Sequence, residues 1–419
     1  MVIPTRFWKS VAVVLVGTGF AQIILVAATP VLSRLFDDVQ IGMLTAFLVL
    51  PNALLPAIGG KFEVAMVLPR SERTARILMG FAVQICLLIS VLLLIWTLSP
   101  IDSGGRFAIY EPLYLFLAGN VLILQYGLNR SDQFARLGHI KIVIAAATIS
   151  MMLLAGWLGA GTGGLIAGSL VGQMVGLAML LRWGLRPRGI VPITFRSARA
   201  TLRRYREFPT FNASSGLVSG LTLALPVLAI ERWCSDAELG QFGMMVRVTA
   251  APAALAMVAI GQVNLRVVSR LSQDGGSALR HVLRTSGVLW LIAIPGAVVA
   301  AIWGPALFAF VLGEDWREAG RFAAILAPAI AARFAVAPLS TTLGATRHNR
   351  LGMTWRLTAF VATATAVLTV GPQGDVGMIL STLAITELGV YLLLLGFVLY
   401  AAARPDSGSS RHRRVDATA

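Results

Sequence analysis

Apolar runs of about 20 residues recur along the whole chain, and this repetition constrains the fold more than any other feature. A helix of that length matches the thickness of one bilayer. Because lipid offers no partner for backbone polar groups, runs this long and uniform are expected to be helices. The sequence therefore predicts an all-α polytopic membrane protein with twelve spans, at roughly 10–32, 41–60, 77–98, 112–129, 142–160, 161–181, 210–230, 239–265, 285–312, 321–343, 352–371 and 376–402.

The distribution of charge tests this map. If the N-terminus is cytoplasmic, 28 of the 35 lysines and arginines fall in cytoplasmic segments, 5 in outside loops and 2 within spans. Cytoplasmic loops carry such an excess of basic residues. We therefore expect a multi-pass membrane protein with both termini cytoplasmic. The net charge of +16 follows from this topology and does not indicate a nucleic-acid partner.

An internal repeat divides the chain into two halves. We expect a six-helix lobe over residues 1–181, a basic cytoplasmic linker over 182–209, a second six-helix lobe over 210–403 and a cytoplasmic tail over 404–419. The two lobes have the same orientation, so a parallel pseudo-two-fold axis along the membrane normal relates them around a central cavity, as in many transporters. The equivalent pairs are Pro30/Pro226, Gly42/Gly240 and Pro51/Pro252.

Proline within a span removes a backbone hydrogen bond and permits a bend. Pro30 and Pro226 occupy equivalent places in the first helix of each lobe and are hinge candidates. The alternative for each is a static kink that neighbouring helices stabilise.

Two further patterns have structural interpretations. The segment 182–207 holds eight arginines and one glutamate, which is typical of an orientation signal and an anchor on the lipid surface. A dock for a partner or a substrate headgroup is the alternative. Four glycines at four-residue steps predict close helix packing along one face of the sixth span: Gly164, Gly168, Gly172 and Gly176.

Apart from Arg321 and Arg356, which lie at span ends that overlap the loops, three charged residues lie inside predicted spans: Arg247, Arg333 and Glu387. Counting along the helices puts Arg333 and Glu387 at about the same depth, roughly 18 Å from the outer surface. A charge facing lipid there is costly, so all three are expected to face the protein interior or a wet cavity. In one interpretation Arg333 and Glu387 form a static pair. In the other, Arg247 and Arg333 bind an anionic group, because the planar guanidinium donates two hydrogen bonds to a phosphate.

The sequence predicts no metal site and no cofactor. The four histidines are scattered. Cys86 lies within a predicted span and Cys234 in an outside loop, so we expect no disulfide between them. The phosphate-binding pattern G-x-x-x-x-G-K-[ST] does not occur.

Several stretches resemble the polysaccharide transporter (Wzx-type flippase) family of the multidrug/oligosaccharidyl-lipid/polysaccharide exporter superfamily. They are "FEVAMVLPRSERTA", "RLFDDVQIG", "GLIAGSLVGQMVG" and "GEDWREAGRFAAILAPAIAARFAVAPLSTT". The resemblance implies a flippase, not an enzyme, that moves undecaprenyl-diphosphate-linked repeat units from the cytoplasmic to the periplasmic leaflet by alternating access. The product would enter lipopolysaccharide or exopolysaccharide biosynthesis, with membrane lipids and a polymerase or export complex as partners. Arg247, Arg333 and Glu387 would line the cavity, with Arg34, Lys61 and Arg130 as weaker candidates.

Two other functions compete with this one. An ion-coupled multidrug extruder would bind cationic drugs and would be expected to have acidic residues in its spans. A membrane-embedded glycan assembly enzyme or factor would be expected to carry a large outside loop. The longest outside loop here is 99–111, with three charged residues, and the charges within spans are two arginines against one glutamate. Both observations favour the flippase.

Overall fold

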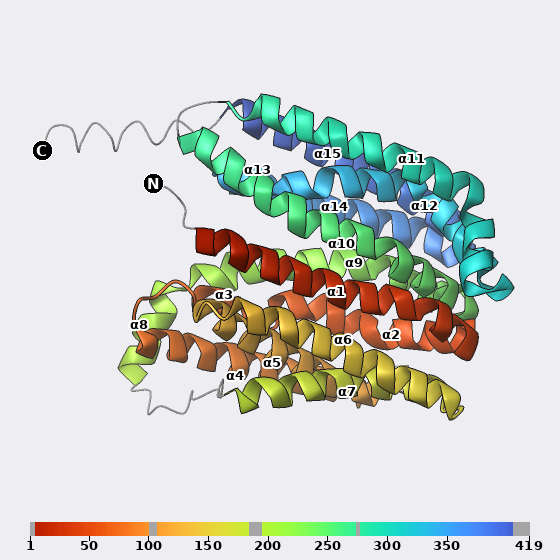
Figure 1. Cartoon of the computed structure of the whole chain (residues 1–419), viewed down its shortest axis with the longest axis horizontal. Helices are drawn as coiled ribbons and strands as arrows, with labels where there is room; N and C mark the ends of the chain where they lie inside the picture. Colours follow the sequence, from red (N-terminus) through yellow and green to blue (C-terminus); the bar gives the residue numbers. More distant parts are fainter. Residues whose placement is uncertain (1–4, 100–106, 184–194, 274–276, 405–419) are drawn as a thin grey trace, which may run out of the picture. The chain divides into compact units, whose positions relative to one another are not determined.

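The computed structural model describes residues 5–99, 107–183, 195–273 and 277–404, and the regular elements in these ranges are all helical (Figure 1). Eleven helical segments among them are long and apolar enough to cross a membrane. The all-α, multi-span fold class is thereby confirmed. The 38-residue α10 is not one of the eleven, and several side chains in 251–258 lie outside the described ones. The count of twelve spans stays a prediction.

The chain packs as two compact units. The first comprises residues 1–231 and 235–243, and the second 232–234 and 244–419. These units follow helix packing, whereas the predicted lobes rest on the internal repeat, so the lobe boundaries stay a prediction. The first unit contains α1 (Thr5–Leu35), α2 (Asp38–Leu54), η1 (Leu55–Ala57), α3 (Phe62–Ala65), α4 (Glu72–Thr97), η2 (Ala108–Tyr110), α5 (Glu111–Arg130), α6 (Phe134–Trp157), α7 (Gly161–Arg182), α8 (Phe195–Arg204), η3 (Phe208–Ala213), most of α9 (Ser214–Trp233) and the start of α10 (Asp236–Gln273).

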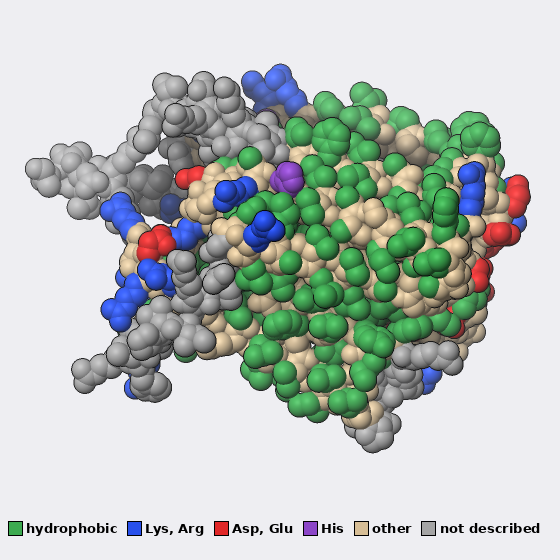
Figure 2. Space-filling view, turned by 60° about the horizontal axis from the view of Figure 1, so that its bottom comes forward, with side chains coloured by type: hydrophobic (Ala, Val, Ile, Leu, Met, Phe, Trp, Pro, Cys, Tyr) green, Lys and Arg blue, Asp and Glu red, His purple; other side chains and the backbone are tan. Residues whose placement is uncertain are grey.

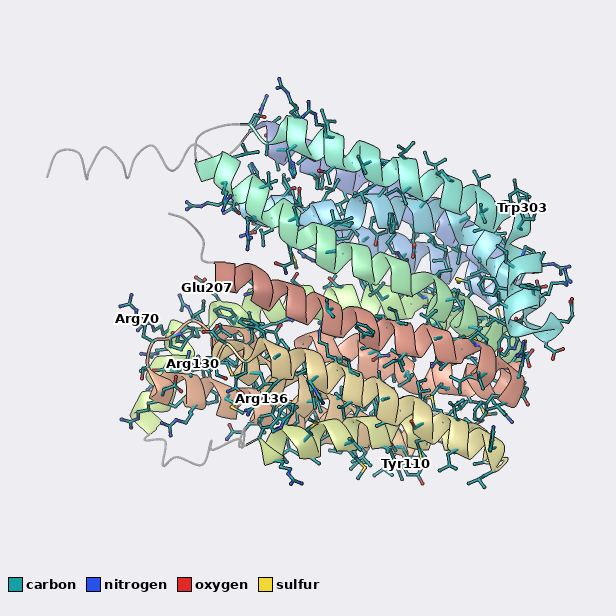
Figure 3. The ribbon with its side chains drawn as sticks, in the orientation of Figure 1. Arg70, Tyr110, Arg130, Arg136, Glu207 and Trp303 are labelled. Atoms are coloured by element: carbon teal, nitrogen blue, oxygen red, sulfur yellow. The ribbon has the colours of Figure 1, made fainter. Side chains whose placement is uncertain are left out.

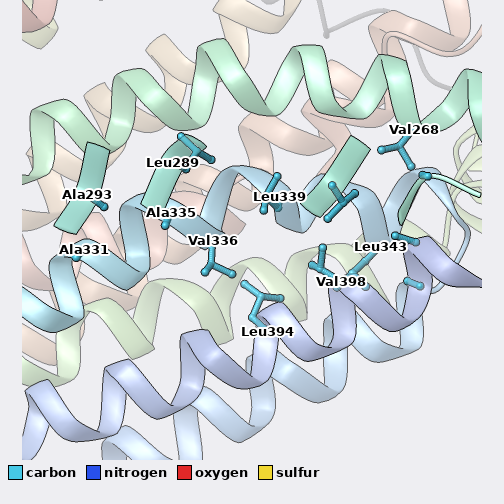
Figure 4. Packing of buried hydrophobic residues seen from close by; sticks show 14 residues of the cluster. Val268, Leu289, Ala293, Ala331, Ala335, Val336, Leu339, Leu343, Leu394 and Val398 are labelled. Carbon is cyan, nitrogen blue, oxygen red and sulfur yellow. The ribbon is translucent and has the colours of Figure 1, made fainter. Parts of the chain in front are cut away.

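The second unit contains the rest of α10 and a bundle built on α11, α12 and α15. Its buried core joins Leu289 and Ala293 of α11 to Ala335 of α12 and Leu394 of α15 (Figure 4). The helices of this bundle are α11 (Leu279–Leu312), η4 (Glu314–Trp316), α12 (Arg317–Val336), η5 (Ala337–Ser340), α13 (Thr341–Ala345), α14 (Asn349–Val370), η6 (Gly371–Gln373) and α15 (Val376–Ala403).

Side chains at the helix starts satisfy backbone N–H groups that have no partner within the helix. Asp37 accepts a hydrogen bond from the Gln40 backbone N–H at 2.7 Å and so caps α2. Asp375 accepts from Gly377 and Met378 and caps α15. These caps fix where the spans begin.

The glycine face of α7 packs against α6. A Cβ atom at Gly168 would lie 2.5 Å from the Met152 side chain and 3.1 Å from the Thr148 carbonyl oxygen, and one at Gly176 would lie 2.6 Å from Ile144. Gly164 and Gly172 meet the same helix. The predicted role of these glycines in packing is confirmed.

Large apolar side chains cover much of the helix surfaces (Figure 2). On α11, for example, Leu291 is 74% exposed and Phe310 85% exposed. In a soluble protein such a surface would be unusual. On helices long enough to cross a bilayer it is the surface that faces lipid.

Two helices begin earlier than the sequence predicts. The sequence places Lys141 and Arg356 in cytoplasmic segments, but α6 begins at Phe134 and α14 at Asn349, so both residues lie within candidate spans. The helix that carries Arg333 also changes form. α12 ends at Val336, and a 3₁₀ turn at Ala337–Ser340 with Pro338 near its start leads into α13.

Candidate functional site

Arg333 and Glu387 meet as an ion pair between α12 and α15. The Arg333 Nη2 atom donates to both carboxylate oxygens of Glu387, at 2.6 Å each. The side chains are 31% and 19% exposed, so the pair is half-buried and not sealed. Counting depth along two helices therefore located real neighbours, and the pair lies well inside both candidate spans, Glu314–Ala345 and Val376–Ala403.

The pair leaves part of the guanidinium unused. The Arg333 Nε–H is buried and has no hydrogen-bond partner among the residues that the structure describes. Tyr391, one turn after Glu387 on α15, hydrogen-bonds to Arg333. Its ring lies 5.9 Å from that of Trp355, which donates to the Val390 carbonyl oxygen at 2.9 Å. These contacts from α14 and α15 hold the carboxylate and the phenol in place around one arginine.

Three other cations, one on α10 and two within candidate spans, have no carboxylate partner in the described part of the chain. Arg247 on α10 is half-buried and makes no ion pair there. The Lys141 Nζ atom on α6 donates to the Thr18 hydroxyl of α1 at 3.0 Å. Arg356 on α14 is half-buried, and its guanidinium lies beside Gly352, one turn earlier. Sequence reasoning missed Lys141 and Arg356 because each lies within about two turns of a helix end, where a loop boundary is hard to place.

The three weaker candidates lie at helix ends. Arg34 is exposed in the last turn of α1. Lys61 takes a left-handed conformation just before α3, with φ of 59°. Its side chain packs over Gly216 at the start of α9.

Arg130, the last residue of α5, is a structural tie: its side chain links the end of α5 to the loop between α3 and α4. Its Nη1 donates to the carbonyl oxygens of Met66 and Pro69, at 2.8 and 2.7 Å, and its Nη2 to Glu72 at 2.8 Å. It thus holds the loop between α3 and α4. Figure 3 shows it at the same end of the first unit as Arg70.

The hinge candidates lie inside continuous helices. α1 runs through Pro30 and α9 runs through Pro226. Their role as hinges stays a prediction.

Glu63 is a buried carboxyl group that sequence reasoning did not single out. Its side chain is fully buried in α3, and its two carboxylate oxygens have no partner side chain among the described residues. Gly59 leaves the space that one of these oxygens occupies. Burial raises the pKa of Glu63, while its own backbone amide and Lys61 oppose the shift. The sequence did point to this residue, because Glu63 is the glutamate of the "FEVAMVLP" stretch that resembles the transporter family.

A comparison with protein families decides the relationship. A family model described as polysaccharide biosynthesis protein matches residues 73–321, more than half of the chain. The chain belongs to this family. None of the curated proteins compared with this chain matches it.

Solved transporter structures share its fold. Lipid II flippase MurJ in an inward closed conformation matches with a TM-score of 0.70 and 13% identity, over 91% of this chain and 86% of MurJ. The MATE multidrug transporter DinF-BH in complex with R6G matches with 0.66 and 15%, over 96% of each chain. An inward-facing multidrug resistance MATE family transporter of the MOP superfamily matches with 0.56 and 13%, over 94% of this chain and 96% of the other.

These findings confirm the predicted polysaccharide transporter family. The protein has a multi-span helical fold that it shares with solved transporters of the MOP superfamily, lipid II flippase MurJ among them. Among the described residues, no group of three or more histidine, cysteine, aspartate or glutamate side chains is placed to hold a metal ion.

Proposed function

We propose that this protein is a flippase for undecaprenyl-diphosphate-linked oligosaccharide repeat units. It moves them from the cytoplasmic to the periplasmic leaflet of the inner membrane for surface polysaccharide synthesis. Membership of the polysaccharide biosynthesis family and a fold shared with lipid II flippase MurJ support this substrate class. A polymerase or export complex on the far side of the membrane would take up the product.

The observation that carries the proposal is the arrangement around Arg333. Glu387 neutralises the arginine at mid-span, which offsets the cost of a charge there. Only Nη2 bonds to Glu387, and the Nε–H has no partner among the described residues. A diphosphate offers several oxygens to a guanidinium, and Arg333 would exchange Glu387 for the diphosphate during transport.

The sign of the charges within the spans favours an anionic cargo. Arg247, Arg333, Lys141 and Arg356 lie inside helices, and Glu387 is the carboxylate that faces one of them. A cation-binding extruder would require the opposite excess. The cationic groups would line the central cavity between two six-helix lobes, Arg247 and Arg333 first among them.

Moving a lipid-linked sugar diphosphate across the membrane is a task that suits a transporter with two lobes around a cavity. A sugar diphosphate does not enter hydrocarbon, whereas its polyprenyl tail can stay in lipid while the headgroup crosses through a wet cavity. The lobes would alternate access, with Pro30 and Pro226 as hinges. Because the chain lacks a nucleotide-binding motif, an ion gradient or the membrane potential would drive the step; moving one charge across 100 mV provides about 2.3 kcal/mol.

Proteoliposomes loaded with a fluorescent undecaprenyl-diphosphate oligosaccharide test the proposal. We expect Arg333→Gln to slow translocation about tenfold or more, because a charge-assisted hydrogen bond contributes about 1.5–3 kcal/mol. Arg321→Gln is the matched control, since Arg321 is exposed on the same helix and pairs with Glu318.

The swapped double variant R333E/E387R separates a binding role from a static pair. It keeps an ion pair between α12 and α15 but moves the guanidinium to the other helix. We expect it to fold and to remain slow. Full recovery of transport in the swap would contradict the proposal, and Glu387-dependent uptake of a cationic dye without oligosaccharide transport would favour the multidrug extruder.

A further inference from the structure

α8 lies next to the start of a candidate membrane span. α8 ends at Arg204, and the candidate span Phe208–Trp233 begins four residues later. α8 also packs against α4, whose own candidate span begins at Glu72. A helix this close to two span ends is within reach of the headgroup region of the bilayer.

One face of α8 is fixed to the first unit. Thr201 and Tyr205, one turn apart, are both buried. Tyr205 belongs to the buried cluster that contains Phe62 and Leu78, and its ring lies 6.3 Å from that of Phe208. Because this face is buried, the side chains on the opposite side of α8 and of the turn after it point away from the first unit.

The outward face is basic and partly apolar. Arg199, Arg203 and Arg204 are exposed on α8, and Arg206 is exposed just after it. Leu202 is also exposed, and Phe211 at the start of the span is 70% exposed. A short helix with arginines beside exposed apolar side chains is typical of helices that lie in the lipid interface.

The neighbouring segment has the same character. Arg70, Arg73 and Arg76 are exposed before and within the first turns of α4, and Leu68 is exposed in the loop before them. Of the nearby carboxylates, Glu72 is paired with Arg130. Figure 3 shows Arg70, Arg130 and Glu207 at the end of the first unit from which α8 projects, whereas Tyr110 lies toward the other end.

We propose that α8 lies on the bilayer surface and binds anionic phospholipid headgroups through Arg199, Arg203 and Arg204. Complementary charge identifies the ligand, because the exposed arginines far outnumber free carboxylates on this surface. Leu202 and Phe211 would enter the interface beside them, and the Thr201–Tyr205 face would hold the helix in this orientation. This surface is separate from the residues assigned to transport, so it adds a lipid requirement to the protein rather than a second path for the substrate.

Hydrogen–deuterium exchange of the purified protein in nanodiscs tests the proposal. We expect residues 199–206 to gain protection as phosphatidylglycerol replaces phosphatidylcholine. In the triple variant R199Q/R203Q/R204Q the phosphatidylglycerol needed for half of that protection should rise by roughly two orders of magnitude, about fivefold for each arginine. Unchanged exchange in the membrane-spanning helices would verify that the variant is folded.

The matched control removes the same charge elsewhere. Arg280 and Arg284 on α11 and Arg350 on α14 are exposed, and R280Q/R284Q/R350Q should leave the protection of 199–206 unchanged. Equal exchange in the two lipids, or an equal effect of the control triple, would overturn the proposal. Protection produced by inorganic phosphate in phosphatidylcholine nanodiscs would also overturn it, because the ligand would then be a free anion. None of these readouts depends on transport.

Discussion

At the scale of single residues, the charged groups of the first unit differ in what compensates their burial. Arg130 has three acceptors, two of them backbone carbonyl oxygens. Glu63 receives no hydrogen bond from another described side chain, although it is fully buried. Arginine stays charged under these conditions, whereas a carboxyl group can bind a proton instead. The two residues therefore respond differently to pH and to substitution.

Glu63 should make stability depend on pH. Because burial raises its pKa, the folded protein binds this proton more tightly than the unfolded chain does. The stabilisation is full below the ordinary pKa near 4.5 and is lost as pH rises through the raised folded value. We expect the thermal midpoint in detergent to fall over this range for the wild type and to change less for Glu63→Gln. Glu72→Gln, at an exposed glutamate, is the control; a wild-type slope in Glu63→Gln would refute the assignment.

Arg130→Lys should destabilise the first unit despite keeping the charge. Lysine is a point donor and does not reproduce the planar fork that reaches Met66, Pro69 and Glu72 together. Each buried acceptor that loses its donor costs about 1–3 kcal/mol. A lower midpoint of thermal unfolding checks this, with Arg73→Lys on the exposed start of α4 as control. Equal midpoints for the two variants would show that Arg130 is not a tie.

The sequence indicated that Arg333 and Glu387 lie at equal depth, because both residues interrupt long apolar runs and helical rise converts position into depth. A pair between them was one of two interpretations, and the structure shows the contact. The same reasoning did not find Glu63, because its segment lies between spans and counts as a loop. The short α3 helix there depends on packing against α4 and α5, which sequence periodicity does not report. The hydrogen bonds of Tyr391 to Arg333 and of Arg130 to Met66 and Pro69 could not be predicted either. Each joins residues far apart in the sequence and depends on which way each helix face is turned.

At the scale of elements, the spans were predictable and their interruptions were not. The length of the apolar run locates a helix such as α7, and the glycines at every fourth residue also identify the face that packs against α6. The 3₁₀ turn at Ala337–Ser340 falls inside one predicted run, 321–343, because its residues are as apolar as their neighbours. Pro338 gives a local reason for the break, but other prolines in predicted spans, such as Pro30 and Pro226, gave the same signal.

Gly168→Ala should weaken the contact between α6 and α7. The new methyl group would lie 2.5 Å from Met152 and 3.1 Å from the Thr148 carbonyl oxygen, so the helices have to separate. Overpacking of this kind costs about 1–3 kcal/mol. Gly163→Ala is the matched control on the same helix, since its methyl group would meet only Phe107 at 3.9 Å. The prediction fails if both variants unfold at the same temperature in detergent.

At the scale of the whole molecule, the predicted internal repeat stays a prediction, but two glycines that it pairs lie in contact. Gly42 and Gly240, predicted as equivalent positions, lie against each other where α2 and α10 begin. A Cβ at Gly42 would meet the Asp236 carbonyl oxygen and lie 3.1 Å from the Gly240 nitrogen. A Cβ at Gly240 would meet the Asp38 carbonyl oxygen and lie 3.0 Å from the Gly42 nitrogen. The contact is reciprocal, as a local two-fold relation between the two helix starts requires.

This contact should decide whether the two helix starts can close together. Gly240→Val would place side-chain atoms against the Asp38 backbone, and α2 and α10 would separate there. Gln241, buried beside it and bonded to Asp38 at 3.3 Å, reports the change when replaced by cysteine in a Cys234→Ala background. A clash of about 1–3 kcal/mol raises its labelling by a membrane-impermeant maleimide roughly five- to hundredfold. Gly389→Val on α15, where an added Cβ meets nothing within 4 Å, should leave labelling unchanged. If Gly240→Val is labelled as slowly as the Gly389→Val control, α2 and α10 come together without this glycine contact. The predicted repeat would then have no role in bringing the two helix starts together.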